Sequence, residues 1–258
     1  MLARHYDSEA ALYEELWAPV LALASKELLN SLPLKEADRI VDVGSGVGTL
    51  LPAIQKGAPQ ATVIAVDRSP GMLQRASPVF ARVIMDATAL GFRPGAFDVA
   101  IMTFVLFHLS DPLHGLKETR RVLKRGGAIG TITWGKAATC PALGALASRL
   151  DMHHAHPDPC PPQHELINDP AEIVELFKAA GFAAERAWGG WIEHEESRDT
   201  FLRRVTGSGP IKRRLELLSP EARRYCLRGA DEDLAKMPPE GFQTRRQVVF
   251  ATARVPDS

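Results

Sequence analysis

The stretch Ile40-Val-Asp-Val-Gly-Ser-Gly-Val-Gly-Thr49 joins a short apolar run directly to a cluster of glycines. The apolar residues at its start predict a buried β-strand. Glycine lets the backbone turn sharply and lets a ligand approach main-chain N–H groups at the start of a following helix. The stretch therefore predicts a strand, a ligand-binding loop and a helix in succession.

The spacing of the glycines separates this loop from the usual dinucleotide-binding loop. The dinucleotide fingerprint has a third glycine three residues after the second. The second glycine here is Gly46, and the position three residues later is Thr49, while the third glycine comes at Gly48. An NAD-type oxidoreductase is therefore disfavoured, although it stays an alternative.

Strand and helix patterns alternate from residue 39 to residue 134. Further short apolar or β-branched runs predict strands at residues 61–67, 81–86, 97–103 and 128–134. Helices are expected after the first, second and fourth of the five strands, and a turn around Pro94-Gly95 leads into the strand at 97–103. This alternation predicts a parallel sheet with helices on both faces.

The flanking regions carry further elements. Apolar residues at helical spacing predict one helix over residues 9–30. A helix is expected from Asp169-Pro170 to Gly181, strands near 184–195 and 245–254, and charged helices over 197–237.

Two aspartates stand at the ends of neighbouring predicted strands. Asp67 closes the second strand and Asp86 closes the third. The carboxyl ends of adjacent parallel strands meet at one crevice, where a carboxylate can accept the hydroxyls of a ribose. We therefore expect residues 44–48, both aspartates and Thr103–Phe104 to line one pocket. In the local alternative, Asp67 caps the next helix and Asp86 holds its own turn.

Five ordered segments resemble motifs of the class I S-adenosylmethionine-dependent methyltransferases. They are Ile40–Thr49, Val63-Ile-Ala-Val-Asp-Arg-Ser-Pro-Gly-Met-Leu73, Asp86-Ala-Thr-Ala-Leu with Gly95-Ala-Phe-Asp-Val99, Phe104-Val-Leu-Phe-His-Leu-Ser-Asp111 and Leu116-Lys-Glu-Thr-Arg-Arg-Val-Leu-Lys-Arg-Gly-Gly127. The subgroup they resemble most includes ubiquinone- and menaquinone-biosynthesis and natural-product methyltransferases. The resemblance is strong over 39–134 and weak over 135–258. It implies a doubly wound, Rossmann-like α/β fold with a mostly parallel seven-stranded sheet, an antiparallel last strand and a helical cap.

The resemblance also implies roles toward S-adenosylmethionine and its product, S-adenosylhomocysteine. The backbone of Gly44, Ser45 and Gly46 would face the methionine moiety, with Gly48 completing the loop and Asp42 holding the loop or, through water, the amino group. Asp67 would bind the ribose hydroxyls, Arg68 and Met72 would flank the adenine, Asp86 and Ala87 would meet its polar edge, and Thr103 and Phe104 would lie near the methyl donor.

The expected reaction is in-line methyl transfer to a small, partly apolar metabolite, whose acceptor atom is oxygen, nitrogen or carbon. His108 follows the fourth strand and has the chemistry of a general base, or else braces its loop. Tyr6, Tyr13 and Trp17 are expected to close the pocket. A descendant that keeps the cofactor without methylating, as a scaffold or a cyclisation catalyst, is a further alternative.

The segment 151–169 is rich in proline and histidine. Imidazole and thiolate groups suit zinc, and the segment holds His153, His154, His156, Cys160 and His164. It contains no helical His-x-x-x-His pair, so we expect no metal. A lid or a substrate-pocket wall that includes His153, His154 and His156 is favoured, with a plain surface loop as the alternative.

Composition narrows the partners and the compartment. The 258 residues carry 31 Lys and Arg against 31 Asp and Glu, so no overall basic field attracts nucleic acid or anionic membrane. The basic residues among positions 203–214 are expected on a solvated helix face. Three separated cysteines and an N-terminus without a secretion pattern indicate a cytoplasmic protein. We expect a monomer or homodimer that acts on a small-molecule acceptor.

One domain is predicted over residues 1–258. Within it we distinguish an N-terminal helical lid at 1–30, a cofactor-binding core at 39–134, the loop at 151–169 and a helical cap at 197–240 inserted before the last strand. The apolar side chains of this cap are expected to pack over the crevice.

Overall fold

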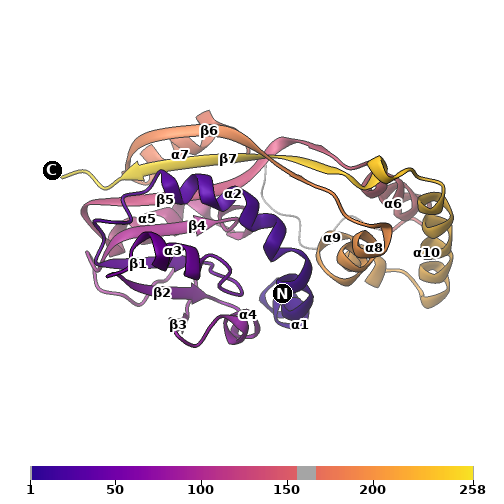
Figure 1. The fold of residues 1–258 in the computed structure, drawn as a ribbon, viewed down its shortest axis with the longest axis horizontal. Helices are drawn as coiled ribbons and strands as arrows, with labels where there is room; N and C mark the ends of the chain where they lie inside the picture. The colour runs from indigo at the N-terminus through magenta and orange to yellow at the C-terminus, as the bar shows by residue number, and fades with distance from the viewer. Residues whose placement is uncertain (1, 156–166, 258) are drawn as a thin grey trace.

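The computed structural model describes residues 2–155 and 167–257 and contains one seven-stranded sheet (Figure 1). The strand order is β3-β2-β1-β4-β5-β7-β6. The strands are β1 (Arg39–Val43), β2 (Thr62–Asp67), β3 (Ala81–Ile84), β4 (Phe97–Thr103), β5 (Leu123–Thr139), β6 (Ala183–His194) and β7 (Thr244–Arg254). Strands β1 to β5 pair in parallel, and β7 runs antiparallel to β5 and β6. The predicted fold class is confirmed.

The position of β7 separates this sheet from a dinucleotide-binding one. The common dinucleotide order is 3-2-1-4-5-6. Here β7 lies between β5 and β6, and it reverses the strand direction at that edge. This topology counts further against an NAD-type oxidoreductase.

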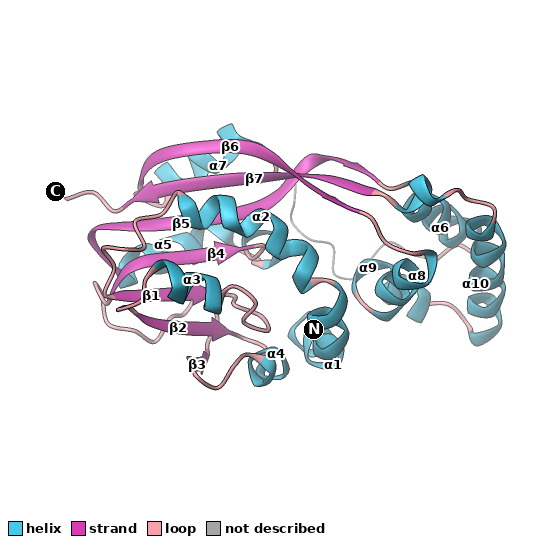
Figure 2. Cartoon of the chain, in the orientation of Figure 1, coloured by secondary structure: helices cyan, strands magenta, loops and turns pink. Residues whose placement is uncertain are grey.

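Helices cover both faces of the sheet (Figure 2). The front face carries α2 (Ala18–Asn30) and α3 (Leu51–Gly57), and the rear face carries α5 (Pro112–Val122) and α7 (Pro170–Ala179). The short α4 (Pro70–Arg75) follows β2, and the 3₁₀ turn η1 (Leu106–His108) follows β4.

Capping side chains mark the starts of three helices. The side chains of Ser69, Asp111 and Asp169 each accept a main-chain N–H of the first turn, and a proline stands next in each case. Helix α5 ends at Val122, ahead of the Gly126-Gly127 pair, because β5 already begins at Leu123.

The prediction of a single helix over residues 9–30 is wrong. The structure has α1 (Leu2–Leu16) and α2, with the break at Trp17. Pro19 lacks an N–H and cannot continue the hydrogen-bond ladder across this point. The break directs α1 away from the sheet, so that it lies between the sheet and a second group of helices (Figure 1).

That second group forms a helical lobe beyond the end of the sheet (Figure 1). It comprises α6 (Pro141–Met152), α8 (Arg198–Gly207), α9 (Gly209–Glu216), α10 (Pro220–Ala235) and the 3₁₀ turn η3 (Pro239–Phe242). Its buried side chains form their own hydrophobic cluster, separate from the sheet core. Of the apolar cap residues, Phe201, Val205 and Leu215 pack within this cluster, whereas residues 208–210 and Arg213 of the same segment line the cavity described below.

Helix α1 connects the core to the lobe. On one side Asp7 Oδ1 accepts hydrogen bonds from Ser69 Oγ at 2.6 Å and Gly71 N at 2.8 Å, which ties α1 to α4. On the other side the buried Glu9 accepts from Lys212 Nζ of α9 at 2.8 Å. The helix therefore has fixed partners on both sides of the space between core and lobe.

Gly44 is a position where the fold requires glycine. Its φ is +73°, and an added Cβ would lie 2.2 Å from Val105 Cγ2. We expect Gly44→Ala to destabilise the protein by about 1–3 kcal/mol, since it combines left-handed strain with overpacking.

The matched control is Gly144→Ala in the interior of α6, where an added Cβ meets nothing within 4 Å. We expect this control to raise stability by about 0.5–1 kcal/mol. Urea denaturation measures both effects, and equal changes in the two variants would contradict the constraint at Gly44.

Candidate functional site

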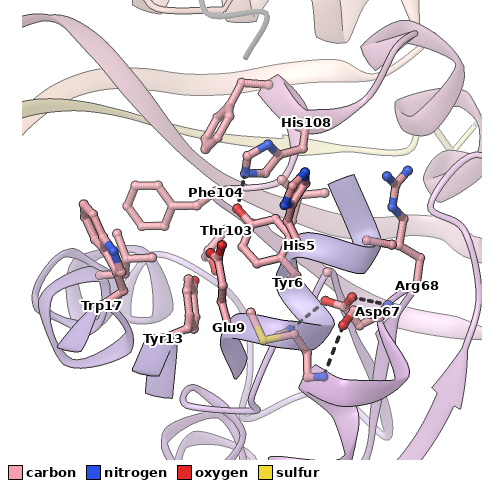
Figure 3. Close-up of a pocket in the computed structure, with 18 of the residues that line it drawn as sticks. His5, Tyr6, Glu9, Tyr13, Trp17, Asp67, Arg68, Thr103, Phe104 and His108 are labelled. Carbon is pink, nitrogen blue, oxygen red and sulfur yellow. Dashed lines mark hydrogen bonds between the residues drawn. The ribbon is translucent and has the colours of Figure 1, made fainter. Parts of the chain in front are cut away.

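A cavity of about 210 Å³ lies at the carboxyl ends of β1, β2 and β4, where side chains of α1 also line it (Figure 3). Twelve predicted site residues line it. These are Tyr6, Tyr13, Trp17, Gly44, Gly46, Asp67, Arg68, Met72, Ala87, Thr103, Phe104 and His108. A second, smaller cavity of about 40 Å³ adjoins the same glycine loop and is lined by Asp42 and Ser45 among others. The convergence of strand ends predicted from the sequence is thus present.

The glycine loop turns its backbone toward the large cavity. The main-chain N–H groups of Gly44 and Ser45 donate to Val66 O at 2.7 and 3.0 Å, which anchors the loop on β2. At Gly46 an added Cβ would meet only Tyr13 Cε1, at 3.9 Å. The backbone at Gly46 is therefore open to a ligand held between the loop and α1.

Gly48 serves a different purpose from the other two loop glycines. Its φ is +75°, and an added Cβ would lie 2.7 Å from the Cβ of Ala76. It lines neither cavity. Gly48 lets the loop pack against α4, so its part in ligand binding is to shape the loop.

Asp42 places a buried carboxyl group beside the small cavity. Its side chain is 1% exposed, and Oδ1 has no hydrogen-bond partner in the part of the chain that the structure describes. Burial, together with the nearby charge of Asp67, raises the pKa of Asp42 to about 7. The cavity has room for water or a small polar head group. A carboxyl oxygen without a partner beside it suits an amino group, directly or through water, so these residues fit the methionine end of the expected cofactor.

Asp67 holds two loops together at the end of β2. Its Oδ2 accepts from Gly46 N and its Oδ1 accepts from Ser69 N, each at 2.8 Å (Figure 3). Burial raises the pKa of Asp67, and these N–H groups oppose that rise. The local alternative is thus partly realised, since Asp67 supports the start of α4. Each oxygen has a second lone pair that can accept a ligand hydroxyl.

Asp86 holds its own turn, as the local alternative predicts. Its Oδ1 accepts from Thr88 N at 2.9 Å and Thr88 Oγ1 at 2.7 Å, and its Oδ2 lies 3.8 Å from Arg68 Nη1. Burial acts to raise the pKa of Asp86, but the Thr88 hydrogen bonds and the Arg68 charge hold it below the usual value. Asp86 lines neither cavity, whereas Ala87 lines the large one.

His108 and Tyr6 form a pair over the cavity (Figure 3). The distance between Tyr6 Oη and His108 Nε2 is 2.8 Å. Burial raises the pKa of Tyr6, so its phenol stays protonated. A base role for His108 Nε2 therefore requires an acceptor to replace the tyrosine hydroxyl.

Phe104 has an unusual backbone for a bulky residue, with φ of +58°. Left-handed backbone at such a residue costs of order 1–3 kcal/mol and concentrates at functional sites. The ring it positions lies 4.6 Å from that of Trp134, centroid to centroid. These rings form an aromatic wall, and Phe107 extends it to His108, with its ring centroid 6.5 Å from that of Trp134 and 4.3 Å from that of His108.

The predicted substrate wall in the segment 151–169 is not found in the described part. His153 and His154 follow the end of α6 and line neither cavity, because α6 belongs to the lobe cluster and points them elsewhere. His156, Cys160 and His164 lie outside the described residues. Among the residues that are described, no three His, Cys, Asp or Glu side chains are grouped to hold a metal ion.

The lining residues that were not predicted include Trp134, Arg213 and Arg246. The expectation of a solvated basic face over 203–214 is wrong for Arg204 and Arg213, which are 4% and 7% exposed. Arg204 is buried because it pairs with Glu196 and stacks on Trp17 at 4.4 Å. Of these three residues, only Trp134 could have been predicted to line the cavity, because it ends the fifth predicted strand at the same edge of the sheet as Asp67.

The glycine loop after β1, the acid at the end of β2 and the strand order define a class I methyltransferase fold. Residues 41–130 match the family model described as a methyltransferase domain. They form a methyltransferase domain of the class that the sequence resembles. Across residues 2–155 and 167–257, none of the helices combines the length and apolar character that crossing a lipid bilayer demands.

Known proteins resemble the chain beyond this segment. Malonyl-[acyl-carrier protein] O-methyltransferase of Dechloromonas aromatica is 28% identical over 233 residues, covering 88% of this chain and 84% of that protein. Demethylmenaquinone methyltransferase of Chlamydia muridarum is 35% identical over 111 residues. The match covers 41% of this chain and about half (48%) of that relative. The solved structure of BH2331 from Bacillus halodurans C-125, assigned as a methyltransferase, has a TM-score of 0.60 at 17% identity, covering 91% and 99% of the two chains, and shows a shared fold.

The buried carboxyl of Asp42 predicts a specific pH dependence of stability. Between the usual pKa of 3.8 and the folded value of about 7, the folded protein holds a proton that the unfolded chain has lost. The contribution of Asp42 to stability therefore falls as the pH rises through this range. We expect the stability of Asp42→Asn relative to wild type to grow by roughly 2–3 kcal/mol between about pH 5 and about pH 8.

Urea denaturation of the ligand-free protein at several pH values measures this difference. The control is Asp38→Asn at an exposed carboxyl, which should follow the wild-type curve. Parallel pH curves for wild type and Asp42→Asn would show that the carboxyl is not held in its neutral form.

Proposed function

We propose that this protein transfers the methyl group of S-adenosylmethionine to a small, partly apolar metabolite. The observation that carries the proposal is a buried oxygen of Asp42 that has no hydrogen-bond partner among the described residues, beside a glycine loop that lines two adjoining cavities. The methyltransferase domain at 41–130 and the names of the relatives support the same reaction class.

Each residue of the cofactor half has a role that its environment supports. Asp42 receives the amino group and the backbone at Gly46 receives the methionine chain. Asp67 accepts the ribose hydroxyls with its remaining lone pairs. Met72 and Arg68 pack against the adenine, and Ala87 offers its backbone at the base edge. Asp86 acts on the adenine only indirectly, through Arg68.

S-adenosylmethionine supplies a methyl group that is activated by a positively charged sulfur. The protein has to align the acceptor with that group and exclude water around it. Phe104, Phe107 and Trp134 provide an apolar wall for this purpose. The pair of Tyr6 and His108 holds a hydrogen-bonding position beside that wall, where it orients an acceptor or takes its proton.

Two measurements test the reaction. Isothermal titration should show binding of S-adenosylhomocysteine, and labelled methyl groups should appear on members of a panel of small metabolites. Absence of S-adenosylhomocysteine binding would contradict the proposal. Binding without transfer to any member would favour the alternative of a scaffold or a cyclisation catalyst, and preferential binding of NADH would favour an oxidoreductase.

Asp67→Ala tests the ribose position. We expect it to weaken S-adenosylhomocysteine binding by about 1–3 kcal/mol, since a charge-assisted acceptor is lost. The control is Asp111→Ala, which removes an N-cap carboxylate of α5 away from the cavity. Titration calorimetry should show unchanged affinity for the control, and an unchanged affinity for Asp67→Ala would refute the assignment.

His108→Ala tests the pair over the cavity. With an acceptor found in the transfer assay, we expect turnover to fall at least about tenfold, because general acid–base groups contribute more than this. The affinity for S-adenosylhomocysteine should stay within about twofold, because His108 lies at the acceptor end. Tyr6→Phe keeps the ring and removes only the hydrogen bond, and the exposed His114→Ala is the control. Equal loss of affinity and turnover would indicate a structural role instead.

A further inference from the structure

Arg246 occupies an unexpected place in the wall of the cavity. It lies on β7 opposite Ala138 of β5 and Ile192 of β6. Its guanidinium carbon lies 3.9 Å from the centroid of the Trp134 ring. The same two side chains line the large cavity, so the flat cation and the indole form one continuous surface there.

No negative group in the described part of the chain balances this cation. The guanidinium makes no hydrogen bond or ion pair with any residue of 2–155 or 167–257, and its Nε is buried without a partner. Burial and the nearby charge of Arg204 lower the pKa of Arg246 to about 10. Arg246 therefore stays protonated at neutral pH, although its burial and the charge of Arg204 both favour the neutral form.

Two buried charged residues nearby differ from Arg246 because each forms an ion pair. Arg204 is buried but pairs with Glu196, and the buried Glu9 pairs with Lys212. Arg213 also lines the cavity and adds positive charge near Tyr6. A buried charge is normally paired, and an unpaired one is costly. The stacking contact with Trp134 compensates only part of that cost, at about 0.5–2 kcal/mol.

Apolar side chains also line this cavity. Trp17, Phe104, Phe107 and Pro210 line it together with Trp134. A ligand that fills it needs an apolar body to meet the rings and a planar anionic group to meet the guanidinium. A carboxylate matches the two parallel N–H donors of an arginine.

From these contacts we infer that the acceptor carries an anionic oxygen group of the carboxylate class and that Arg246 binds this group. The inference rests on the proposed function and names the class of acceptor for the same cavity. Arg246 is thus a specificity-determining residue, and Trp134 holds its guanidinium in place.

The test uses the full protein saturated with S-adenosylhomocysteine. Benzoate, naphthoate and decanoate are titrated beside the matching neutral amides, so that only the charge differs within each pair. We expect at least one carboxylate to bind about tenfold more tightly than its amide, as a charge-assisted pair provides. In Arg246→Gln the preference should fall below about threefold, while the affinity for S-adenosylhomocysteine stays the same.

Two further variants keep the test decisive. Arg246→Lys retains the charge and should retain part of the preference, which separates loss of charge from misfolding. The control is Arg245→Gln on the exposed side of the same strand, where Arg245 pairs with Glu193 at 2.7 Å, and it should leave the preference unchanged.

Absence of a carboxylate preference across the whole wild-type panel would overturn the inference, as would a full preference in Arg246→Gln. Failure of the wild type to bind S-adenosylhomocysteine would appear in the preceding titration. That result would overturn the proposed function, and the inference with it.

Discussion

The hydrogen bond from the Gly46 N–H to the Asp67 carboxylate joins the loop after β1 to the end of β2. The two groups meet because β1 and β2 pair in parallel, with Val43 opposite Val66, so both chains leave the sheet at the same edge. Asp67 also holds Ser69, and Ser69 caps α4 and donates to Asp7 of α1. A single carboxylate therefore connects the glycine loop, the next helix and the N-terminal helix. The cavity exists where these three segments meet.

The cofactor half of the cavity could be predicted from the sequence because its residues follow strands that are close in the chain. The strand ends at Val43, Asp67 and Thr103 carry the loop, the acid and the residues beside the acceptor. Parallel pairing brings such ends together without further information. The caps at Ser69 and Asp111 could be predicted for the same reason, since each depends only on the residues that follow it.

The acceptor half could not be predicted, because its residues depend on distant contacts. Arg246 reaches the cavity through the antiparallel register of β7 against β5 and β6. Arg213 reaches it because the lobe positions α9 against α1. The packing partners of the lobe's apolar residues could not be predicted, because a helix pattern shows that a face is buried without showing what covers it, which here is α6 and α10. The break before α2 had a local cause in Pro19, which the overall helical pattern concealed.

The link between the sheet and the lobe has a mechanical consequence. Strands β5, β7 and β6 continue past the core as one hydrogen-bonded ribbon, with Thr139, Arg245 and Glu193 still in register near its far end. A three-stranded ribbon resists bending far more than a single linker. The pairing is irregular between Trp134 and Ala138, so any remaining twist of the ribbon is concentrated there, beside the aromatic wall. A change of acceptor is therefore expected to come from substitution of the side chains at that irregularity, and not from rigid-body movement of the lobe.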